Sequence, residues 1–294
     1  MKGWLIVNGF LHSNKYGELY ALLQNAAEKR GITLGLKTGD GIFLDVQTDG
    51  QLFPLPDFVL FWDKDVTLAK RLETLGVPLF NSARAVEVCD RKTLTALALA
   101  QAGVPAPKTI LAPKTFEGIG YTRLDFLDSA ENALGYPMVL KEDCGSFGKQ
   151  VYLASNRAEA ETIIAGLGHK EFIMQEFIAE SSGRDLRVNV VGGRAVSAML
   201  RENSEDFRSN ISSGGSGKAY QPSALQAELA VRAATACGLD FAGVDLLFGK
   251  DGPLVCEVNS NPHFKSTLDC TGQDLSLEIL AYIAEKLDKA KARI

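Results

Sequence analysis

Short apolar runs alternate with helical segments over the first 81 residues, and this alternation restricts the fold more than any other feature. The runs WLIVNGF (4–10), FVLFW (58–62) and VPLFN (77–81) have the length and apolar character of buried strands. Between them, ELYALLQNAAEKRG and VTLAKRLETLG place apolar residues at helical spacing, and Gly31 stops the first of these helices. Strands that alternate with helices pair in parallel, so these residues predict an α/β lobe. No GxGxxG follows the first run, so the dinucleotide fingerprint is absent there.

After about residue 85 the pattern changes to paired strands. DRKTLTALALAQAG (90–103) predicts an amphipathic helix, and the VPAP that follows begins an extended segment. YPMVLKED (136–143) and VYLA flank a glycine-bearing turn and predict a hairpin. The further elements that we expect are a helix at 156–166, a strand at 171–178, an antiparallel pair that turns at 192–193, a Ser/Gly loop at 212–218, a helix at 223–237, two strands joined at KDG, and a helix at 275–292. The fold class predicted is α/β followed by α+β.

The overall composition narrows the class of protein without indicating a reaction. Hydrophobic residues make up 46% and charged residues 23% of the 294 residues, which is ordinary for a globular chain of two or three lobes. A net charge of −5 gives no general attraction to nucleic acid or acidic membranes, and the first apolar run is too short to span a membrane. Five cysteines without a CxxC pair or a secretion signal argue against a zinc site and predict a cytoplasmic protein.

Three oxygen-bearing side chains near the C-terminus are the strongest local sign of a chemical site. Glu257 and Asn259 lie two residues apart on one predicted strand, so their side chains leave the same face. Asp245 lies on the neighbouring strand across the KDG turn. Such ligands suit Mg²⁺, which shares its coordination shell with substrate phosphates. Alternatively, Glu257 and Asn259 line a solvated face, but the apolar run around them opposes this because buried carboxylates need a charge partner or a metal.

Lys141 ends the apolar strand YPMVLK, and a glycine-bearing turn containing Gly145 and Ser146 follows it. This order would place an ammonium group beside exposed backbone amides, where phosphate oxygens can be bound. The Walker pattern GxxxxGK[ST] is absent at this place. Taken alone, the motif favours the alternative, a plain hairpin with a snorkelling lysine.

The sequence QEFI ends the predicted strand at 171–178 and supplies the groups that an adenine edge requires. Its backbone offers donors and acceptors, and its last two side chains offer apolar walls. The candidate residues are Gln175, Glu176, Phe177 and Ile178. Taken alone, this segment would be a core strand in most proteins.

Three arginines form a candidate cationic group, namely Arg187 in RDLRV, Arg201, and Arg208 in FRSN beside Asn210. The guanidinium fork suits phosphate and carboxylate oxygens. Each arginine alone would be an ordinary surface charge.

Taken in order along the chain, these motifs resemble the ATP-grasp superfamily and, within it, the RimK-type ligases. The resemblance covers nearly the whole chain and is carried by DRK, VPAP, YPMVLK with its glycine loop, QEFI, GRDLRV, FRSN, AGVDLL and LVCEVNSNP. It implies an N-terminal parallel α/β domain at 1–85 and two α+β lobes, at 86–170 and 171–294, that clasp ATP between them. It also implies an ATP-dependent ligase that joins a carboxylate to an amine through an acyl phosphate and releases ADP and phosphate.

The resemblance assigns roles in ATP binding to five residues. It implies that Lys92 and Lys141 contact phosphates, that Glu176 and Phe177 form the adenine hinge, and that Asp185 lies near the ribose. These roles predict a nucleotide cleft between the second and third lobes.

The resemblance also assigns the charged groups that act on the reacting phosphate. Arg208 and Asn210 would face the γ-phosphate or the acyl phosphate, with Arg187 and Arg201 as further catalytic cations. The ligands implied for the metal are Asp245, Glu257 and Asn259. Mg²⁺ is the metal expected, as two ions, with Mn²⁺ able to substitute.

The chain departs from the ribosomal-protein glutamate ligases of this group at several places. Arg91 stands where they have an aspartate, and Lys149 has no equivalent in their glycine loop. NSNPHFKS replaces their small-residue and proline–glycine stretch, so residues 263–265 bring different bulk and charge beside the metal ligands. WDKD (62–65) stands where the family usually has an arginine. We expect the last two places to contact the acceptor or the amine, and neither glutamate nor a ribosomal protein follows as a substrate.

Two other function classes stay open, an ATP-grasp phosphotransferase and a nucleotide-binding regulator without turnover. The complete set of phosphate and metal residues argues against the regulator. For the ligase, the partners expected are a carboxylate and an amino acid or other amine, and the acceptor can be a small molecule, a peptide or a protein tail. No nucleic acid or membrane is expected as a partner, and a homo-oligomer is left open.

Overall fold

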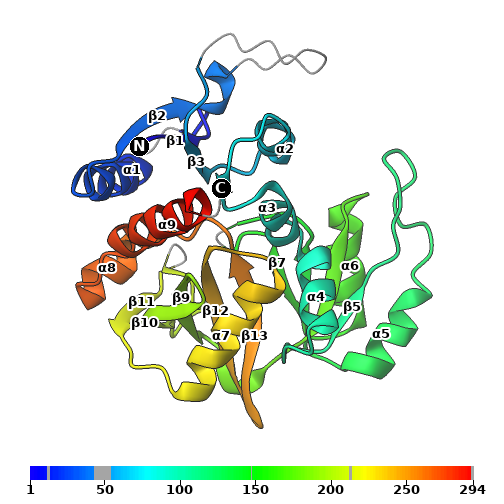
Figure 1. Ribbon diagram of the computed structural model, residues 1–294. Helices are drawn as coiled ribbons and strands as arrows, with labels where there is room; N and C mark the ends of the chain where they lie inside the picture. Colours follow the sequence, from blue (N-terminus) through cyan, green and yellow to red (C-terminus); the bar gives the residue numbers. More distant parts are fainter. Residues whose placement is uncertain (12–13, 43–53, 147, 212–213, 293–294) are drawn as a thin grey trace.

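The computed structural model describes residues 1–11, 14–42, 54–146, 148–211 and 214–292. These residues form three sheets whose faces are covered by helices (Figure 1). Each sheet is built from consecutive strands: β1–β4 form the N-terminal sheet, β5–β8 the central sheet and β9–β13 the C-terminal sheet.

The N-terminal sheet is parallel throughout and has the strand order β2-β1-β3-β4. Its elements are β1 (Lys2–Val7), α1 (Asn14–Glu28), β2 (Thr33–Thr38), the 3-10 turn η1 (Gly39–Gly41), β3 (Phe58–Trp62), α2 (Val66–Thr74), β4 (Leu79–Phe80) and α3 (Ala83–Asp90). All five residues of β3 are buried, as its uninterrupted apolar run predicts for a central parallel strand. The three predicted strands are confirmed, although the first ends at Val7, and β2 was not predicted because its TLGLKT run is only partly apolar.

The central sheet is antiparallel and has the order β5-β8-β6-β7. Its region contains α4 (Lys92–Gln101), β5 (Thr109–Leu111), α5 (Phe126–Leu134), β6 (Met138–Glu142), β7 (Val151–Ala154), α6 (Arg157–Leu167) and β8 (Phe172–Glu176). Leu127 of α5 and Ile164 of α6 pack with Leu140 and Phe172 in one buried cluster. The predicted hairpin is confirmed, since β6 and β7 pair directly.

The C-terminal sheet is antiparallel and has the order β11-β10-β9-β12-β13. Its region contains η2 (Ala179–Ser181), β9 (Arg184–Val191), β10 (Arg194–Glu202), β11 (Ser216–Ala219), α7 (Ala224–Ala236), β12 (Phe241–Gly249), β13 (Gly252–Asn259), α8 (Lys265–Thr271) and α9 (Leu275–Lys291). Gly192 and Gly193 make the predicted turn, and both have positive φ, of 55° and 72°.

The loop predicted at 212–218 is wrong for its last three residues, because these belong to the edge strand β11. Ser and Gly suggest a loop, but an edge strand takes its hydrogen bonds from its neighbour, here β10. A Cβ at Gly217 would come within 2.7 Å of the Met199 sulfur, so a larger residue here would displace the Met199 side chain. Residues 212 and 213 lie outside the described residues.

The helix predicted at 90–103 begins later, at Lys92. Arg91 is extended, with φ −110° and ψ 113°, and separates α3 from α4. The sequence around it contains no glycine or proline that would mark this break.

The last helix, α9, packs against the N-terminal sheet and α1 and forms part of their hydrophobic core (Figure 1). Ile279, Ile283 and Leu287 of α9 share one buried cluster with Leu23 of α1 and Leu60 of β3. The N-terminal sheet is therefore packed against chain from the opposite end of the sequence. None of the helices in the described part of the chain has both the length and the apolar character needed to span a membrane.

Candidate active site

Two adjoining cavities collect every site residue that the sequence predicts. The first lies between the central and C-terminal sheets and the second between the C-terminal sheet and the N-terminal sheet. Fourteen of the predicted residues line the first cavity, and Arg187 and Asn259 line the second. The residues that line both are Gly145, Ser146, Arg201, Asn210 and Glu257. The two cavities therefore meet at Glu257 and at the glycine-bearing turn.

Two lysines of the first cavity are placed for an anion. Lys141 lies on the middle of the central sheet, is only 7% exposed, and has its Nζ 3.5 Å from the Cys256 sulfur. Lys92 begins α4, and its backbone N–H donates to the Asp143 carbonyl at 2.9 Å. Neither ammonium group forms an ion pair with a described residue. Because a buried cation without a counter-charge is costly, this part of the cavity suits a phosphate.

The turn after β6 is tied to the loop after β10. Arg208 donates from Nη1 to the Gly148 carbonyl at 2.8 Å, and its other nitrogens bind Asp206. Gly148 has a φ of +72°, and a Cβ there would lie 2.8 Å from Asn210 Oδ1. A glycine is thus required for the turn to approach Asn210 this closely.

The end of β8 forms one wall of the first cavity. Gln175, Glu176, Phe177 and Ile178 all line it, as predicted. The Phe177 ring meets Phe207 edge-on, with centroids 6.3 Å apart, and Val139 and Leu247 add further apolar surface. Such a slot suits the faces of a flat ring system.

The Glu176 side chain is used inside the protein. Its Oε1 accepts from the Lys108 N–H at 2.6 Å, and its own N–H donates to the Lys108 carbonyl at 3.0 Å. The family resemblance implies a hinge role for Glu176, and these contacts occupy its side-chain Oε1 and its backbone N–H.

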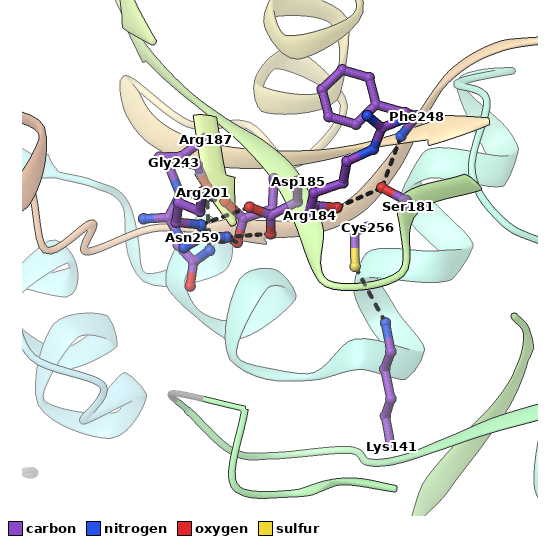
Figure 2. A network of polar contacts seen from close by, with 11 residues as sticks. Lys141, Ser181, Arg184, Asp185, Arg187, Arg201, Gly243, Phe248, Cys256 and Asn259 are labelled. Carbon is purple, nitrogen blue, oxygen red and sulfur yellow. Dashed lines mark hydrogen bonds and ion pairs between the residues drawn. The ribbon is translucent and has the colours of Figure 1, made fainter. Parts of the chain in front are cut away.

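A buried ion network covers the cavity face of the C-terminal sheet (Figure 2). Arg201 Nε donates to Asp185 Oδ1 at 2.7 Å, and Arg201 Nη2 lies 3.0 Å from Asp245 Oδ2. Arg187 grips the same Asp245 carboxylate with two nitrogens, of which Nη2 donates at 2.8 Å. The register explains this, because Arg187 is opposite Asp245 and Asp185 is opposite Arg201, and opposed residues share a face.

The two carboxylates of this network differ in proton affinity. Burial raises the pKa of Asp185, and the nearby Asp245 charge adds to that rise against the attraction of Arg201. Burial also opposes ionisation of Asp245, but Arg187 and Arg201 outweigh it and hold the pKa of Asp245 below its ordinary value. Asp245 is thus the firmly ionised member, and two guanidinium groups share it.

Glu257 and Asn259 offer oxygens that no described group uses. The Glu257 carboxylate is half-buried and forms no hydrogen bond or ion pair with the residues that the structure describes. Asn259 donates its Nδ2 to the Gly243 carbonyl at 3.3 Å, which leaves its side-chain oxygen for a ligand. One carboxylate and one amide oxygen at the junction of two cavities suit a hard cation that keeps water and phosphate ligands. The third predicted ligand, Asp245, is engaged by the arginines.

Sequence reasoning missed residues on both sides of the junction. A β-bulge between Asp245 and Leu246 breaks the alternation of β13, so Cys256 lines the first cavity together with Glu257. In the N-terminal lobe, Tyr16 and Tyr20 line the second cavity. Their spacing of four on a helix after the first strand is a signal that could have found them.

Comparisons with known proteins give a consistent family. The model of the RimK-like ATP-grasp domain matches residues 89–283. The chain is 32% identical over 270 residues to the uncharacterized protein MG012 homolog of Mycoplasma pneumoniae, covering 90% of this chain and 92% of that protein. It is 34% identical over 230 residues to a probable alpha-L-glutamate ligase of Parasynechococcus marenigrum, covering 77% of this chain. It is 35% identical over 234 residues to beta-citrylglutamate synthase B of Danio rerio, covering 79% of this chain. The match spans 48% and 56% of the lengths of these last two relatives.

Solved structures of similar shape cover nearly the whole chain. A RimK domain ATP-grasp protein from Sphaerobacter thermophilus superposes with a TM-score of 0.74 at 21% identity, covering 96% of this chain and 99% of that one. D-alanine–D-alanine ligase from Bacillus anthracis, complexed with ATP, gives 0.73 at 18% identity, covering 100% and 99%. At these identities the likeness concerns the fold.

Proposed function

The chain belongs to the RimK-like ATP-grasp family and has the ATP-grasp fold. Relatives of this family are ligases, and the chain is an ATP-dependent ligase of a carboxylate and an amine. We propose that its two cavities hold the two halves of that reaction. The first cavity takes ATP, and the second takes the carboxylate and the amine. Glu257, at their junction, lies where the phosphate and the substrate meet.

One observation carries this proposal, which is the set of unpaired charges around the first cavity. Lys92 and Lys141 have no carboxylate partner, and Glu257 has no cationic partner, among the described residues. Two cations and one anion left unpaired in one cleft are complementary to a polyphosphate with its metal ion. The apolar slot beside Phe177 is complementary to the base of the same nucleotide.

We propose the order of events that this chemistry requires. An oxygen of the substrate carboxylate attacks the γ-phosphorus of ATP, ADP leaves, and an acyl phosphate forms. The amine nitrogen then attacks the acyl carbon and expels phosphate, which leaves an amide. Lys92, Lys141 and Arg208 hold phosphate oxygens and balance their charge, so positioning and electrostatics supply most of the catalysis.

The metal in this proposal is Mg²⁺, with Glu257 and Asn259 as the residues that would hold it. The fit rests on the unpaired carboxylate of Glu257 and on the anchored amide of Asn259. Asp245 is the third candidate ligand, and two ions with replacement by Mn²⁺ stay part of the proposal. Mg²⁺ bound here would neutralise phosphate charge and orient the transferring group.

The names of the relatives favour a class of substrate for the amine. Two relatives carry names that include glutamate ligase and citrylglutamate synthase, which favours an amino acid as the amine. The acceptor is a small molecule, a peptide or a protein tail. All five cysteines are free thiols, which favours a reducing compartment such as the cytoplasm.

The test is phosphate release from Mg-ATP across a panel of carboxylates, amino acids and short peptides, with mass spectrometry of each positive. We expect ADP, phosphate and a new amide mass for one pair. Glu257→Gln should reduce turnover by at least about 100-fold while ATP still binds, because the variant loses a charge at the metal. Glu202→Gln is the control, since Glu202 pairs with Lys218 outside both cavities. A phosphorylated product without an amide would show a phosphotransferase, and full activity of the Glu257 variant would contradict the metal assignment.

A further inference from the structure

Asp63 lies at the place in the N-terminal sheet where a ligand is expected. In the strand order β2-β1-β3-β4, β2 lies on one side of β1, and β3 and β4 lie on the other side. The direction in which the chain crosses the sheet therefore switches between β1 and β3. In parallel sheets a crevice opens at such a switch point, outside the carboxyl ends of the two strands. Asn8 follows β1 and Asp63 follows β3, and Asn8 Nδ2 donates to Asp63 Oδ1 at 3.3 Å. Both residues line the second cavity.

The Asp63 carboxylate is buried without a cation. Its residue is 8% exposed, and Oδ1 also accepts from the Lys64 N–H at 2.7 Å. No described lysine, arginine or histidine forms an ion pair with it. Asn261 fixes its backbone by donating to the Asp63 carbonyl at 3.0 Å. A buried carboxylate held rigidly beside an open cavity needs a counter-charge, and none of the described lysines, arginines or histidines supplies one.

The other charges around the second cavity are already balanced. Lys64 Nζ lies 2.5 Å from Asp90 and donates to Ser146 Oγ at 3.2 Å. Arg187 and Arg201 are paired with Asp245. The only charged cavity residues without an ion pair to a described residue are Asp63 and Glu257, and Glu257 belongs to the metal proposal. Among the described residues, one negative charge is therefore left for the substrate.

Aromatic rings surround the same crevice. Tyr16 and Tyr20 stack with centroids 6.4 Å apart, and His263 meets Tyr16 edge-on at 6.1 Å. Burial, followed by the neighbouring Tyr16 and Asp63, raises the pKa of Tyr20 to about 12, so its hydroxyl stays neutral and adds no charge of its own. Ring faces of this kind attract cations.

We propose that Asp63 is a specificity-determining residue that binds a primary ammonium group of the substrate in the second cavity, beside Tyr16 and Tyr20. This inference rests on the proposed function, in which that cavity holds the carboxylate and the amine. The ammonium group belongs either to the α-position of an amino acid or to the far end of its side chain. Neither a substrate without an ammonium group nor one with a carboxylate in its place would balance Asp63.

Four six-carbon carboxylates separate these possibilities by isothermal titration in the presence of Mg²⁺ and a non-hydrolysable ATP analogue. Hexanoate has no ammonium group, norleucine has it at the α-position, 6-aminohexanoate has it at the far end, and lysine has both. We expect at least one aminated probe to bind about tenfold or more tightly than hexanoate, and the probe that does so identifies the position. Equal binding of all four, or no binding of the aminated probes, would overturn the proposal.

Two variants make the test specific to Asp63. Asp63→Asn keeps the shape and the acceptor for Asn8, and should abolish the preference for the aminated probes while the affinity for the ATP analogue and the melting temperature stay close to wild type. Asp65→Asn is the matched control, because Asp65 is exposed, does not line the cavity, and caps α2 through the Leu68 N–H, which asparagine also does. A preference that survives Asp63→Asn would refute the role of Asp63. Binding does not require turnover, so the preference of Asp63 is measured independently of amide formation. Failure of the phosphate-release test would contradict the ligase mechanism and leave this inference standing.

Discussion

At the scale of single residues, the contact between Gly148 and Asn210 couples two loops that belong to different sheets. The Gly148 carbonyl accepts from Arg208, and the space that its missing Cβ leaves is occupied by Asn210 Oδ1. The glycine-bearing turn and the arginine loop are therefore in direct contact beside the first cavity, and we expect a change in one to displace the other.

Replacing Gly148 by alanine should weaken ATP binding with little loss of stability. The positive φ costs an alanine about 1 kcal/mol, and its Cβ would push against Asn210 and displace Arg208. We expect the KM for ATP to rise about tenfold, measured by steady-state phosphate release. Gly118→Ala is the control, because Gly118 has a φ of +81° and no atom within 4 Å of an added Cβ. An unchanged KM in the Gly148 variant would mean that this contact does not shape the ATP site.

Sequence reasoning works best at this scale for residues whose role follows from type and spacing. Glu257 and Asn259 were predicted on one face from a period of two, and their backbone pairing agrees with this. Cys256 could not be predicted, because the bulge that turns it into the cavity has no glycine or proline to mark it. The engagement of Asp245 by two arginines was also missed, since it depends on the register of three strands.

At the scale of elements, Asp143 fastens α4 to the end of β6. Its Oδ1 accepts from the Thr93 N–H at 2.8 Å, and its Oδ2 accepts from Arg91 Nε at 2.6 Å. Burial opposes its charge, but the bond from Thr93 and the guanidinium of Arg91 outweigh burial and hold the pKa of Asp143 below its ordinary value. This clamp sets the position of Lys92, the first residue of the helix.

Asp143→Asn should make stability less sensitive to acid. A carboxyl whose pKa is lower in the folded state stabilises the protein above its unfolded pKa of about 3.9, and this stabilisation is lost as the pH falls toward the folded value. We expect the variant to be about 2 kcal/mol less stable at pH 7, and the gap to narrow below pH 4, as measured by urea unfolding. Asp125→Asn, at an exposed position, should show no gap at either pH. A gap that stays constant from pH 7 to pH 3 would contradict the ionised clamp.

Element prediction succeeded where hydrophobic periodicity was strong and failed where pairing decided the structure. The buried runs of β3, β6 and β12 were all predicted as strands. The sequence predicts a loop where β11 forms, because its SGKA run carries no apolar pattern and pairs only with β10. The separation of α3 from α4 follows from the clamp of Asp143 on Arg91, a contact 52 residues apart in sequence.

At the scale of the whole molecule, the N-terminal sheet depends on the rest of the chain. Its core includes α9, and Trp62 of β3 stacks on Phe241 of β12 with centroids 5.4 Å apart. Sequence patterns predict the parallel lobe, and we propose its limit at residue 85 on the same grounds. The second limit, at residue 170, is a proposal from the family resemblance, although β8, just after it, pairs within the central sheet. The patterns do not predict which lobe packs against which, because the contacts between lobes join residues far apart in sequence.

Asn81 forms buried hydrogen bonds between the N-terminal sheet and the C-terminal region. It is fully buried, its Nδ2 donates to the carbonyls of Phe241 and Ser260 at 3.0 and 2.9 Å, and its Oδ1 accepts from the Asp240 N–H at 2.7 Å. Alanine would leave these buried backbone groups without partners, at a cost of about 3 kcal/mol or more.

Asn81→Ala should therefore loosen the N-terminal sheet before the other two sheets. The chain has two tryptophans, Trp4 and Trp62, and both lie in that sheet, so their fluorescence reports on it selectively. We expect the urea midpoint from fluorescence to fall below the midpoint from far-ultraviolet circular dichroism, and affinity for an ATP analogue to change less than twofold, because the first cavity lies between the other sheets. Ser82→Ala, which removes only the cap of α3, should cost about 1 kcal/mol and keep the two midpoints together. Coincident midpoints in Asn81→Ala would show that the three sheets unfold as one unit, and that the second cavity rests on more than this one asparagine.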